Sequence, residues 1–303
     1  MPDAFLFPGQ GSQHAGMGAD VLEDPEVARL ADRCADAAGI DLRRLLTEAD
    51  DDELRLTTNA QPVLLFMGVA LARLLGCQGV RPSAAAGHSV GEYTALCVAG
   101  ALGPEEAVRL IVARGRAMAD ASPPGTSSMA AVLGLAPDAV RDVLAGLTDV
   151  WPANYNTPNQ VVVGGTMAAL ERAAERLREA GARRVLPLNV AAAFHTPLME
   201  PAGAVLRRAL DAVDWRAPEV PVVANLTAEP YAAAGEIPAT LERQLSSPVR
   251  WADCVARLSD LGCDRFVEVG PKRALTGMMR ELAPTAGRAT VSDPEAAAFL
   301  QPT

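Results

Sequence analysis

Lysine and histidine are both scarce in this 303-residue sequence: Lys272 is the single lysine among 27 basic residues, and there are three histidines. Any chemistry that needs an imidazole must therefore use His14, His88 or His195. Acidic residues outnumber basic ones and give a net charge of −10. Because phosphate backbones and anionic lipids recruit basic surfaces, this balance excludes a general nucleic-acid or membrane-surface binder.

Paired cysteines are also missing. The five cysteines form no C-x-x-C pair and have no histidine nearby, which argues against a disulfide framework and a metal site, and predicts a reducing, cytoplasmic location. No basic N-terminal segment leads into an apolar run, and no stretch approaches the roughly 20 apolar residues that span a bilayer. We therefore expect neither export nor membrane insertion. Half of the residues are apolar, as in ordinary globular proteins.

The two ends of the chain alternate short buried strands with helices. Residues 4–7 form a predicted strand, and residues 61–76 a deeply buried helix with Pro62 in its first turn. A second strand at 84–86 leads through a sharp turn into a helix that ends near Cys97. Further expected elements are a helix at 104–119 and short buried strands within 220–226 and 265–270. This order predicts an α/β fold whose core surrounds a parallel sheet.

The middle of the chain has a different texture. Strands are expected within 129–135, 159–165 and 183–190, and amphipathic helices at 137–147 and 167–181. The order strand–helix–strand–strand–helix–strand is typical of a ferredoxin-like module. With a linker at 122–128, we predict a small ferredoxin-like subdomain, 125–194, inserted into a large subdomain formed by 1–124 and 195–303.

Residues 87–91, Gly-His-Ser-Val-Gly, lie between the predicted strand and helix. G-x-S-x-G in this setting is the nucleophile-elbow pattern of α/β-hydrolase-like cores, in which the glycines permit a tight turn that exposes the serine hydroxyl. Ser89 is therefore the candidate nucleophile. The bare pattern also occurs in ordinary glycine turns, so the assignment depends on the strand–turn–helix context.

A serine nucleophile needs a base. His88 is a poor candidate, because side chains of neighbouring residues on such a turn point apart, and His14 lies in a loop without an obvious partner. His195 lies where the small module returns to the core, which is a plausible cleft edge. It falls too far from the C-terminus for the usual serine–acid–histidine order. A distinct serine–histidine arrangement, with the imidazole oriented by a carbonyl instead of a carboxylate, fits this order better.

Collinear motifs along the chain resemble the malonyl-CoA:acyl-carrier-protein transacylase family. They are FPGQGSQHAGMG (7–18), AQPVLLF (60–66), GHSVGEYTAL (87–96), ARGRAM (113–118), NYNTPNQVVVGG (154–165), AAAFHTPLM (191–199), QLSSPVRW (244–251) and VEVGPKRALTG (267–277). The resemblance covers nearly the whole chain. It implies an α/β-hydrolase-like core with an inserted ferredoxin-like subdomain, and a malonyl transferase that needs no metal or organic cofactor.

The resemblance also implies roles for individual residues. Ser89 and His195 match the nucleophile and base, and Gln244 matches the residue whose carbonyl orients the histidine. Gln10 and Val90 match the donors of the oxyanion hole through their backbone N–H groups. Arg114 matches the arginine that binds the malonyl carboxylate, which suits the planar guanidinium. The remaining substrate-binding candidates are Gln61, Asn156, Phe194 and His88.

Substrate preference and partners follow from the same resemblance. Val90 and Phe194 match the pattern of malonyl-selecting members, because a bulky Phe194 leaves little room for a 2-methyl group. The implied partners are malonyl-CoA and an acidic acyl carrier protein, for which Arg183, Arg184, Lys272 and Arg273 are candidate docking residues. We expect a monomer. The alternatives are an acyl hydrolase acting on carrier proteins, which would have little use for Arg114, and a non-catalytic scaffold, which would need no serine–histidine pair.

Overall fold

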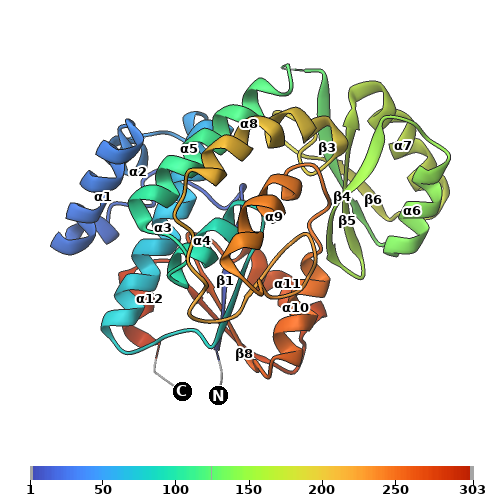
Figure 1. Ribbon diagram of the computed structural model, residues 1–303. Coiled ribbons are helices and arrows are strands. Elements are labelled where there is room, and N and C mark those ends of the chain that lie inside the picture. The colour runs from blue at the N-terminus through green and yellow to red at the C-terminus, as the bar shows by residue number, and fades with distance from the viewer. Residues whose placement is uncertain (1–2, 124, 301–303) are drawn as a thin grey trace.

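The computed structural model describes residues 3–123 and 125–300. Figure 1 shows a large part built around one sheet and, beside it, a smaller part built around a second sheet. The first sheet has five parallel strands in the order β7-β2-β1-β8-β9, and the second has four antiparallel strands in the order β4-β5-β3-β6. The predicted α/β class with a parallel sheet is confirmed.

Helices cover both faces of the parallel sheet, so its strands are apolar on both sides, and every residue of β1 and β2 is buried. The strands of this part are β1 (Asp3–Phe7), β2 (Ala84–Gly87), β7 (Val222–Val223), β8 (Arg265–Val269) and β9 (Gly287–Val291). Its helices are α1 (Pro25–Ala38), α2 (Leu42–Thr47), α3 (Thr57–Cys77), α4 (Val90–Val98), α5 (Pro104–Asp120), α8 (Glu200–Asp211), α9 (Ile237–Gln244), α10 (Trp251–Asp260), α11 (Ala274–Leu282) and α12 (Pro294–Phe299).

The smaller part has the order β3-α6-β4-β5-α7-β6, and its strand order is that of a ferredoxin-like fold, as predicted. Its elements are β3 (Ser127–Leu133), α6 (Pro137–Ala145), β4 (Val150–Thr157), β5 (Gln160–Thr166), α7 (Met167–Glu179) and β6 (Arg184–Pro187). The subdomain boundaries at 124/125 and 194/195 stay a prediction. Residue 124, inside the predicted linker, lies outside the described residues.

Helix α3 differs from its prediction in two respects. It begins at Thr57, so Pro62 lies inside the helix and not in its first turn. Because an interior proline removes one helical hydrogen bond, close packing must offset the loss, and every residue from Ala60 to Ala72 is buried. By length and composition alone α3 could also cross a membrane, but 72% of its most apolar stretch is buried inside the protein, so the expectation of no membrane insertion stays a prediction.

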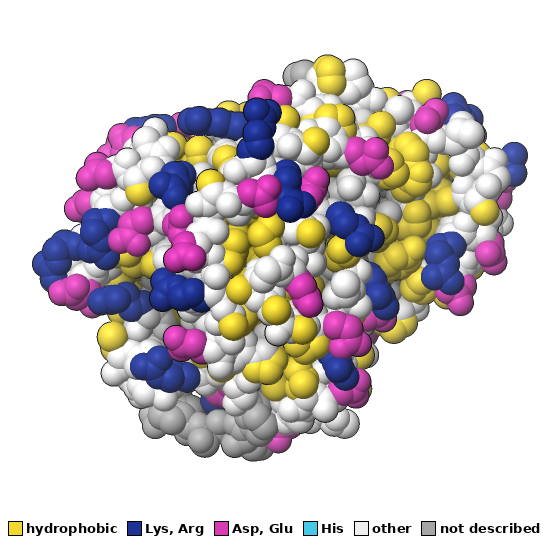
Figure 2. Space-filling model, viewed as in Figure 1, with side chains coloured by type: hydrophobic (Ala, Val, Ile, Leu, Met, Phe, Trp, Pro, Cys, Tyr) yellow, Lys and Arg dark blue, Asp and Glu magenta, His cyan; other side chains and the backbone are white. Residues whose placement is uncertain are grey.

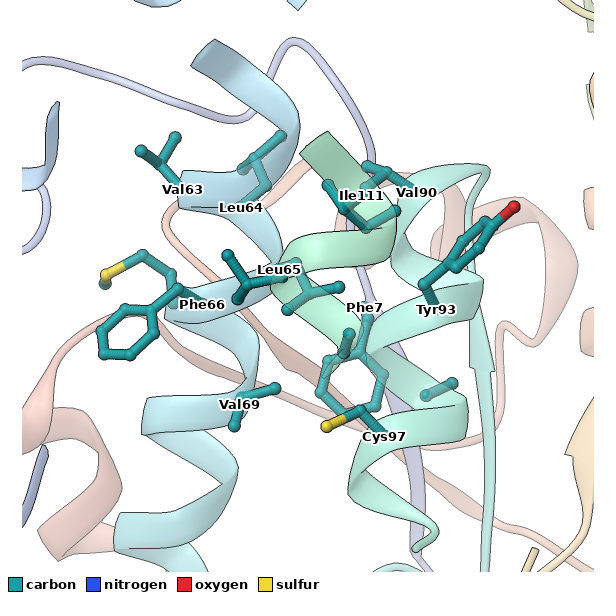
Figure 3. Packing of buried hydrophobic residues seen from close by; sticks show 14 of the residues in the cluster. Phe7, Val63, Leu64, Leu65, Phe66, Val69, Val90, Tyr93, Cys97 and Ile111 are labelled. Carbon is teal, nitrogen blue, oxygen red and sulfur yellow. The ribbon is translucent and has the colours of Figure 1, made fainter. Parts of the chain in front are cut away.

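The core beneath the parallel sheet is formed by α3, α4 and α5. Figure 3 shows Leu65 of α3, Ile111 of α5 and Phe7 of β1 in the space between these helices, with Val90 and Tyr93 of α4 beside them. From Val90 to Cys97 every residue of α4 is buried. The helix that follows Ser89 therefore has neighbours on all sides, which holds its first turn in place.

The carboxyl ends of the parallel strands meet at one edge of the sheet. Gln10 follows β1, Ser89 follows β2 and Asn225 follows β7, and these strands are neighbours. In open α/β sheets, ligands bind outside this edge. The antiparallel sheet is joined to the same region, because Tyr155 of β4 donates its backbone N–H to the Val249 carbonyl oxygen at 2.9 Å.

Candidate active site

The turn between β2 and α4 places Ser89 in the left-handed backbone region, with φ +56° and ψ −108°. A non-glycine residue there stores strain of roughly 1–3 kcal/mol, a feature that is concentrated at functional sites. The flanking glycines are needed for close approach. A Cβ atom on Gly87 would lie 1.8 Å from the carbonyl carbon of Gly91, and one on Gly91 would lie 2.1 Å from the Phe7 carbonyl oxygen. The helix can cross the strand this closely only without these side chains.

Asn225 holds the turn from below. Its side-chain Oδ1 accepts the Ser89 backbone N–H at 2.8 Å, and its Nδ2 donates to the Gly87 carbonyl oxygen at 2.7 Å. The residue is fully buried. Asn225 thus satisfies the Ser89 N–H and the Gly87 carbonyl oxygen in the strained turn, and it leaves the Ser89 hydroxyl available to other partners.

His195 faces that hydroxyl from a second strained position, with φ +60°. Its Nε2 lies 2.7 Å from Ser89 Oγ, and its Nδ1 lies 2.8 Å from the Gln244 carbonyl oxygen. Because a carbonyl oxygen only accepts, Nδ1 carries the proton and Nε2 presents its lone pair to the serine hydroxyl. The predicted serine, histidine and glutamine carbonyl are thus brought into one hydrogen-bonded chain.

Burial controls the charge of this imidazole. Removal from water, followed by the positive charge of Arg114, lowers the pKa of His195 to about 3. The hydrogen bond to Gln244 acts in the opposite direction but is weaker than the burial effect. His195 is therefore neutral near pH 7, which is the form that can accept a proton.

Arg114 lies on α5 with only 1% of its surface exposed. Its Nη1 donates to Gln61 Oε1 at 2.7 Å, and its Nη2 donates to Ser89 Oγ at 3.0 Å and to Gln244 Oε1 at 3.1 Å. The guanidinium also lies 5.4 Å from the ring centre of Tyr93. No carboxylate of the described residues lies within 4.0 Å of it. A buried cation without an anion is costly, so this site has the electrostatics of an anion receptor.

These groups surround a cavity of about 100 Å³. Apolar side chains of Met129, Leu188, Val190 and Phe194 are among those that line the cavity. Of the residues predicted from the sequence, the cavity is lined by Gln10, Gln61, His88, Ser89, Val90, Arg114, Phe194 and His195. Among the described residues, neither Gln10 nor Val90 uses its backbone N–H in a hydrogen bond, so both donors are available.

Asn156 is placed differently from its prediction. It does not line the cavity; its Oδ1 lies 3.0 Å from His88 Nε2, and its Nδ2 donates to Gln160 Oε1. The His88 ring also packs 5.5 Å from the Trp251 ring. Asn154, two residues earlier, lines the cavity instead, and its buried Oδ1 has no partner among the described residues. The substrate-binding role expected of Asn156 stays a prediction.

Sequence reasoning missed three further residues at the site: Asn154, Asn225 and Glu92. Glu92 is fully buried in the first turn of α4, and its carboxylate accepts from Gln244 Nε2 at 2.7 Å. Its only sequence signal was an acidic residue near a helix N-terminus, which is common and is explained by the helix dipole. The Asn225 signal was weaker still, a single amide after a short apolar strand.

Comparisons with known proteins agree with this geometry. Residues 4–293 match the family described as acyl transferase domain. The chain is 40% identical to a malonyl CoA-acyl carrier protein transacylase of Bacillus subtilis, over 96% of this chain and 94% of the relative. It is 39% identical to the protein of the same name in Escherichia coli K12, over 97% of each chain.

Solved structures are similar over the same length. An acyl carrier protein S-malonyltransferase from Vibrio cholerae superposes with a TM-score of 0.95 at 37% identity, covering 99% of this chain and 100% of that one. A malonyl-transacylase in complex with a type II polyketide synthase acyl-carrier protein superposes with a TM-score of 0.93 at 38% identity, covering 98% of each chain.

Proposed function

The chain belongs to the malonyl-CoA:acyl-carrier-protein transacylase family, and on that premise we propose that it transfers malonyl groups from malonyl-CoA to the phosphopantetheine thiol of an acyl carrier protein. The observation that carries the proposal is Arg114, a buried guanidinium without an ion-pair partner among the described residues, beside a serine–histidine pair. A malonyl group supplies the two functions that this pairing requires, a thioester carbonyl for Ser89 and a carboxylate for Arg114.

In the first half-reaction, His195 Nε2 takes the Ser89 hydroxyl proton while Oγ attacks the thioester carbonyl carbon. The carbonyl oxygen becomes an oxyanion, which the N–H groups of Gln10 and Val90 stabilise, each such donor commonly contributing roughly 3–4 kcal/mol. The C–S bond then breaks, and the coenzyme A sulfur leaves with the proton held on His195. Malonyl-serine remains.

In the second half-reaction, the phosphopantetheine thiol gives its proton to His195 and attacks the malonyl-serine ester. The same oxyanion forms and collapses, and Ser89 recovers its proton from the imidazole. Every proton transfer uses Nε2, because Nδ1–H stays on the Gln244 carbonyl oxygen. A main-chain carbonyl thus replaces the acid of a triad, and the proposed steps use no metal or organic cofactor.

Selectivity has two sources in this proposal. Arg114 pairs with the carboxylate that acetyl-CoA lacks, and a guanidinium can do so through two parallel hydrogen bonds. Phe194, which lines the same cavity, leaves little room for a 2-methyl branch, a difference that contributes about 1–3 kcal/mol per methyl group. The hydrolase alternative has no comparable support, because the relatives are named transacylases.

Carrier-protein docking belongs to the same proposal. The candidate docking residues Arg183, Arg184, Lys272 and Arg273 are all exposed. On the face shown in Figure 2, acidic and basic side chains are intermixed, so a local basic cluster must direct an acidic partner. A cytoplasmic, monomeric enzyme in fatty-acid or polyketide synthesis, with no nucleic-acid or membrane partner, remains part of the proposal.

Acyl-enzyme formation tests the proposal directly. After incubation with malonyl-CoA and acid quench, the intact mass should rise by one malonyl group, and addition of a phosphopantetheinylated carrier protein should remove it. Ser89→Ala should abolish the mass increase. Persistent labelling of that variant, or loss of the label to water at the same rate without carrier protein, would contradict malonyl transfer through Ser89.

A further inference from the structure

A fully buried carboxylate lies directly beneath the proposed active site. Glu92 has none of its surface exposed, and no lysine or arginine of the described residues forms an ion pair with it. Its Oε1 accepts the Tyr231 hydroxyl, and its Oε2 accepts the Asn225 backbone N–H at 3.0 Å and Gln244 Nε2 at 2.7 Å. All three donors come from the segment that leads from β7 to the end of α9.

This geometry fixes the direction of the Gln244 amide. Arg114 Nη2 can only donate and the Ser89 carbonyl oxygen can only accept, so the Gln244 oxygen must face Arg114 and the Gln244 NH2 must face Ser89. Gln244 donates the same NH2 to Glu92 Oε2. Its Oε1 consequently faces the other way, where it accepts Arg114 Nη2 at 3.1 Å. The reversed amide would place an oxygen against Oε2 and an NH2 against the guanidinium.

Gln244 connects Glu92 to Ser89, His195 and Arg114 through hydrogen bonds. Its NH2 also donates to the Ser89 carbonyl oxygen at 3.1 Å, and its own carbonyl oxygen accepts from His195 Nδ1 at 2.8 Å. Arg114 is held by two amide oxygens, those of Gln61 and Gln244, and by no carboxylate of the described residues. Without the Gln244 oxygen, Arg114 Nη1 would still donate to Gln61, but Nη2 would keep only its hydrogen bond to Ser89 Oγ.

We propose that Glu92 is a positioning residue that sets acyl selectivity: by orienting the Gln244 amide it holds Arg114 where a carboxylate on the acyl group can pair with it. The inference rests on the proposed malonyl transfer and adds a residue that touches no substrate. Its effect should be selective, because acetyl transfer needs Ser89 and His195 but not the guanidinium. Glu92 should therefore control the ratio of malonyl to acetyl transfer more than either rate alone.

The matched variants are Glu92→Met, which removes both acceptors at similar volume, and Glu92→Gln, which keeps one acceptor oxygen and replaces the other with an NH2 group. A glutamine can turn its oxygen toward Asn225 and Gln244 and its NH2 toward the Tyr231 oxygen, which accepts. Tyr231→Phe removes one hydrogen bond to Glu92 and supplies a milder test. Glu268 is the structural control, because it is equally buried but accepts backbone N–H groups of Leu275 and Thr276 at the start of α11.

The experiment measures kcat/KM for malonyl-CoA and acetyl-CoA with one phosphopantetheinylated carrier protein, and Tm for each variant. Glu92→Met should lower the malonyl-to-acetyl ratio at least about 10-fold, and Glu92→Gln should keep it within about threefold of the wild type. Tyr231→Phe should lower it by about two- to fivefold. Glu268→Met should lower Tm and leave the ratio unchanged.

Equal losses for both substrates in Glu92→Met, or a Glu92→Gln ratio as low as that of Glu92→Met, would overturn the inference. If Glu92→Met does not fold, Tyr231→Phe decides, and an unchanged ratio in that variant would overturn it. The wild type separates this result from the proposed function. Wild-type malonyl transfer with an unresponsive ratio refutes the role of Glu92 alone, whereas absence of wild-type transfer refutes both.

Discussion

The two sides of the Ser89 cavity are built from different chemistry. The side formed by the parallel-sheet part carries Ser89, Arg114 and His195, which are linked by hydrogen bonds of 2.7–3.0 Å. The side formed by the antiparallel part and the segment after it contributes Met129, Asn154, Leu188, Val190 and Phe194, which are apolar apart from one amide. The parallel-sheet part therefore supplies the hydrogen-bonded polar groups and their charge, whereas the inserted module and the segment after it supply mostly apolar surface.

Cavity size does not distinguish the reactive region. A larger cavity of about 620 Å³ lies among α1, α3 and α5, and two of its charged residues, Arg33 and Glu105, form an ion pair at 2.7 Å. The Ser89 cavity is about 100 Å³ but contains an unpaired buried cation and a neutral imidazole. A buried charge without an ion-pair partner therefore indicates the candidate active site better than cavity volume does.

The largest effect should come from the base on the reactive side. His195→Ala should slow acylation by malonyl-CoA by about 100-fold or more, in line with general-base contributions of 10² to 10⁴. Rapid-quench measurement of malonyl-enzyme formation would test this. His88→Ala is the control, since His88 Nε2 is engaged by Asn156, and a mild loss in His195→Ala beside a severe one in His88→Ala would break the assignment.

The next effect should separate charge from shape. Arg114→Ala should lower kcat/KM for malonyl-CoA by about 30-fold or more, because the substrate carboxylate is left unpaired in a buried site. Acetyl transfer should stay level or improve. Arg116, exposed on the same helix, provides the matched control. Equal losses for malonyl- and acetyl-CoA in Arg114→Ala would mean that Arg114 supports the fold and not the carboxylate.

A change on the module side should be smaller and unselective. Asn156→Ala removes the hydrogen bond to His88, and we expect kcat/KM to fall by less than about 10-fold for both acyl groups alike. Asn159, exposed in the turn after β4, is the control position. If Asn156→Ala reduced malonyl transfer selectively, the module would contribute to carboxylate recognition, and the contrast between the two sides would be lost.

The smallest effect should be that of mild acid on the acylation step. A base works in its unprotonated form, and burial lowers the pKa of His195 from 6.5 to about 3. The neutral form therefore persists well below pH 6.5, so the single-turnover acylation rate should be flat between about pH 5 and 8. If the acylation rate instead fell toward acid with a midpoint near pH 6.5, the His195 imidazole would be exposed to solvent, contrary to its burial in the structure.

Much of this arrangement could be predicted because its signals are local. The strand–turn–helix around Ser89 is encoded by neighbouring residues, and the ferredoxin-like module by the alternation of helical and strand periods. Because the sequence has only three histidines, the base could be predicted by excluding the other two. The structure brings Ser89, His195 and the Gln244 carbonyl within hydrogen-bond distance, as the predicted roles require.

What could not be predicted depends on contacts between distant segments. Glu92 and Asn225 meet across 133 residues, and no periodicity in the sequence records a buried polar pair. That Asn154 and not Asn156 lines the cavity also depends on geometry that the sequence does not record. Residues two apart on a strand normally share a face, but register shifts in β4 between Pro152 and Asn154 and between Tyr155 and Thr157 redirect the side chains.

The small volume of the Ser89 cavity affects how long a malonyl-enzyme would last before a carrier protein binds. A malonyl group on Ser89 would occupy much of a cavity of about 100 Å³ and displace water from it. The malonyl-serine ester would then face a thiol that reaches it along the pantetheine arm more readily than it faces water. We expect the loaded enzyme to persist between carrier encounters, so that carrier supply sets throughput; rapid decay of isolated malonyl-enzyme in buffer would show otherwise.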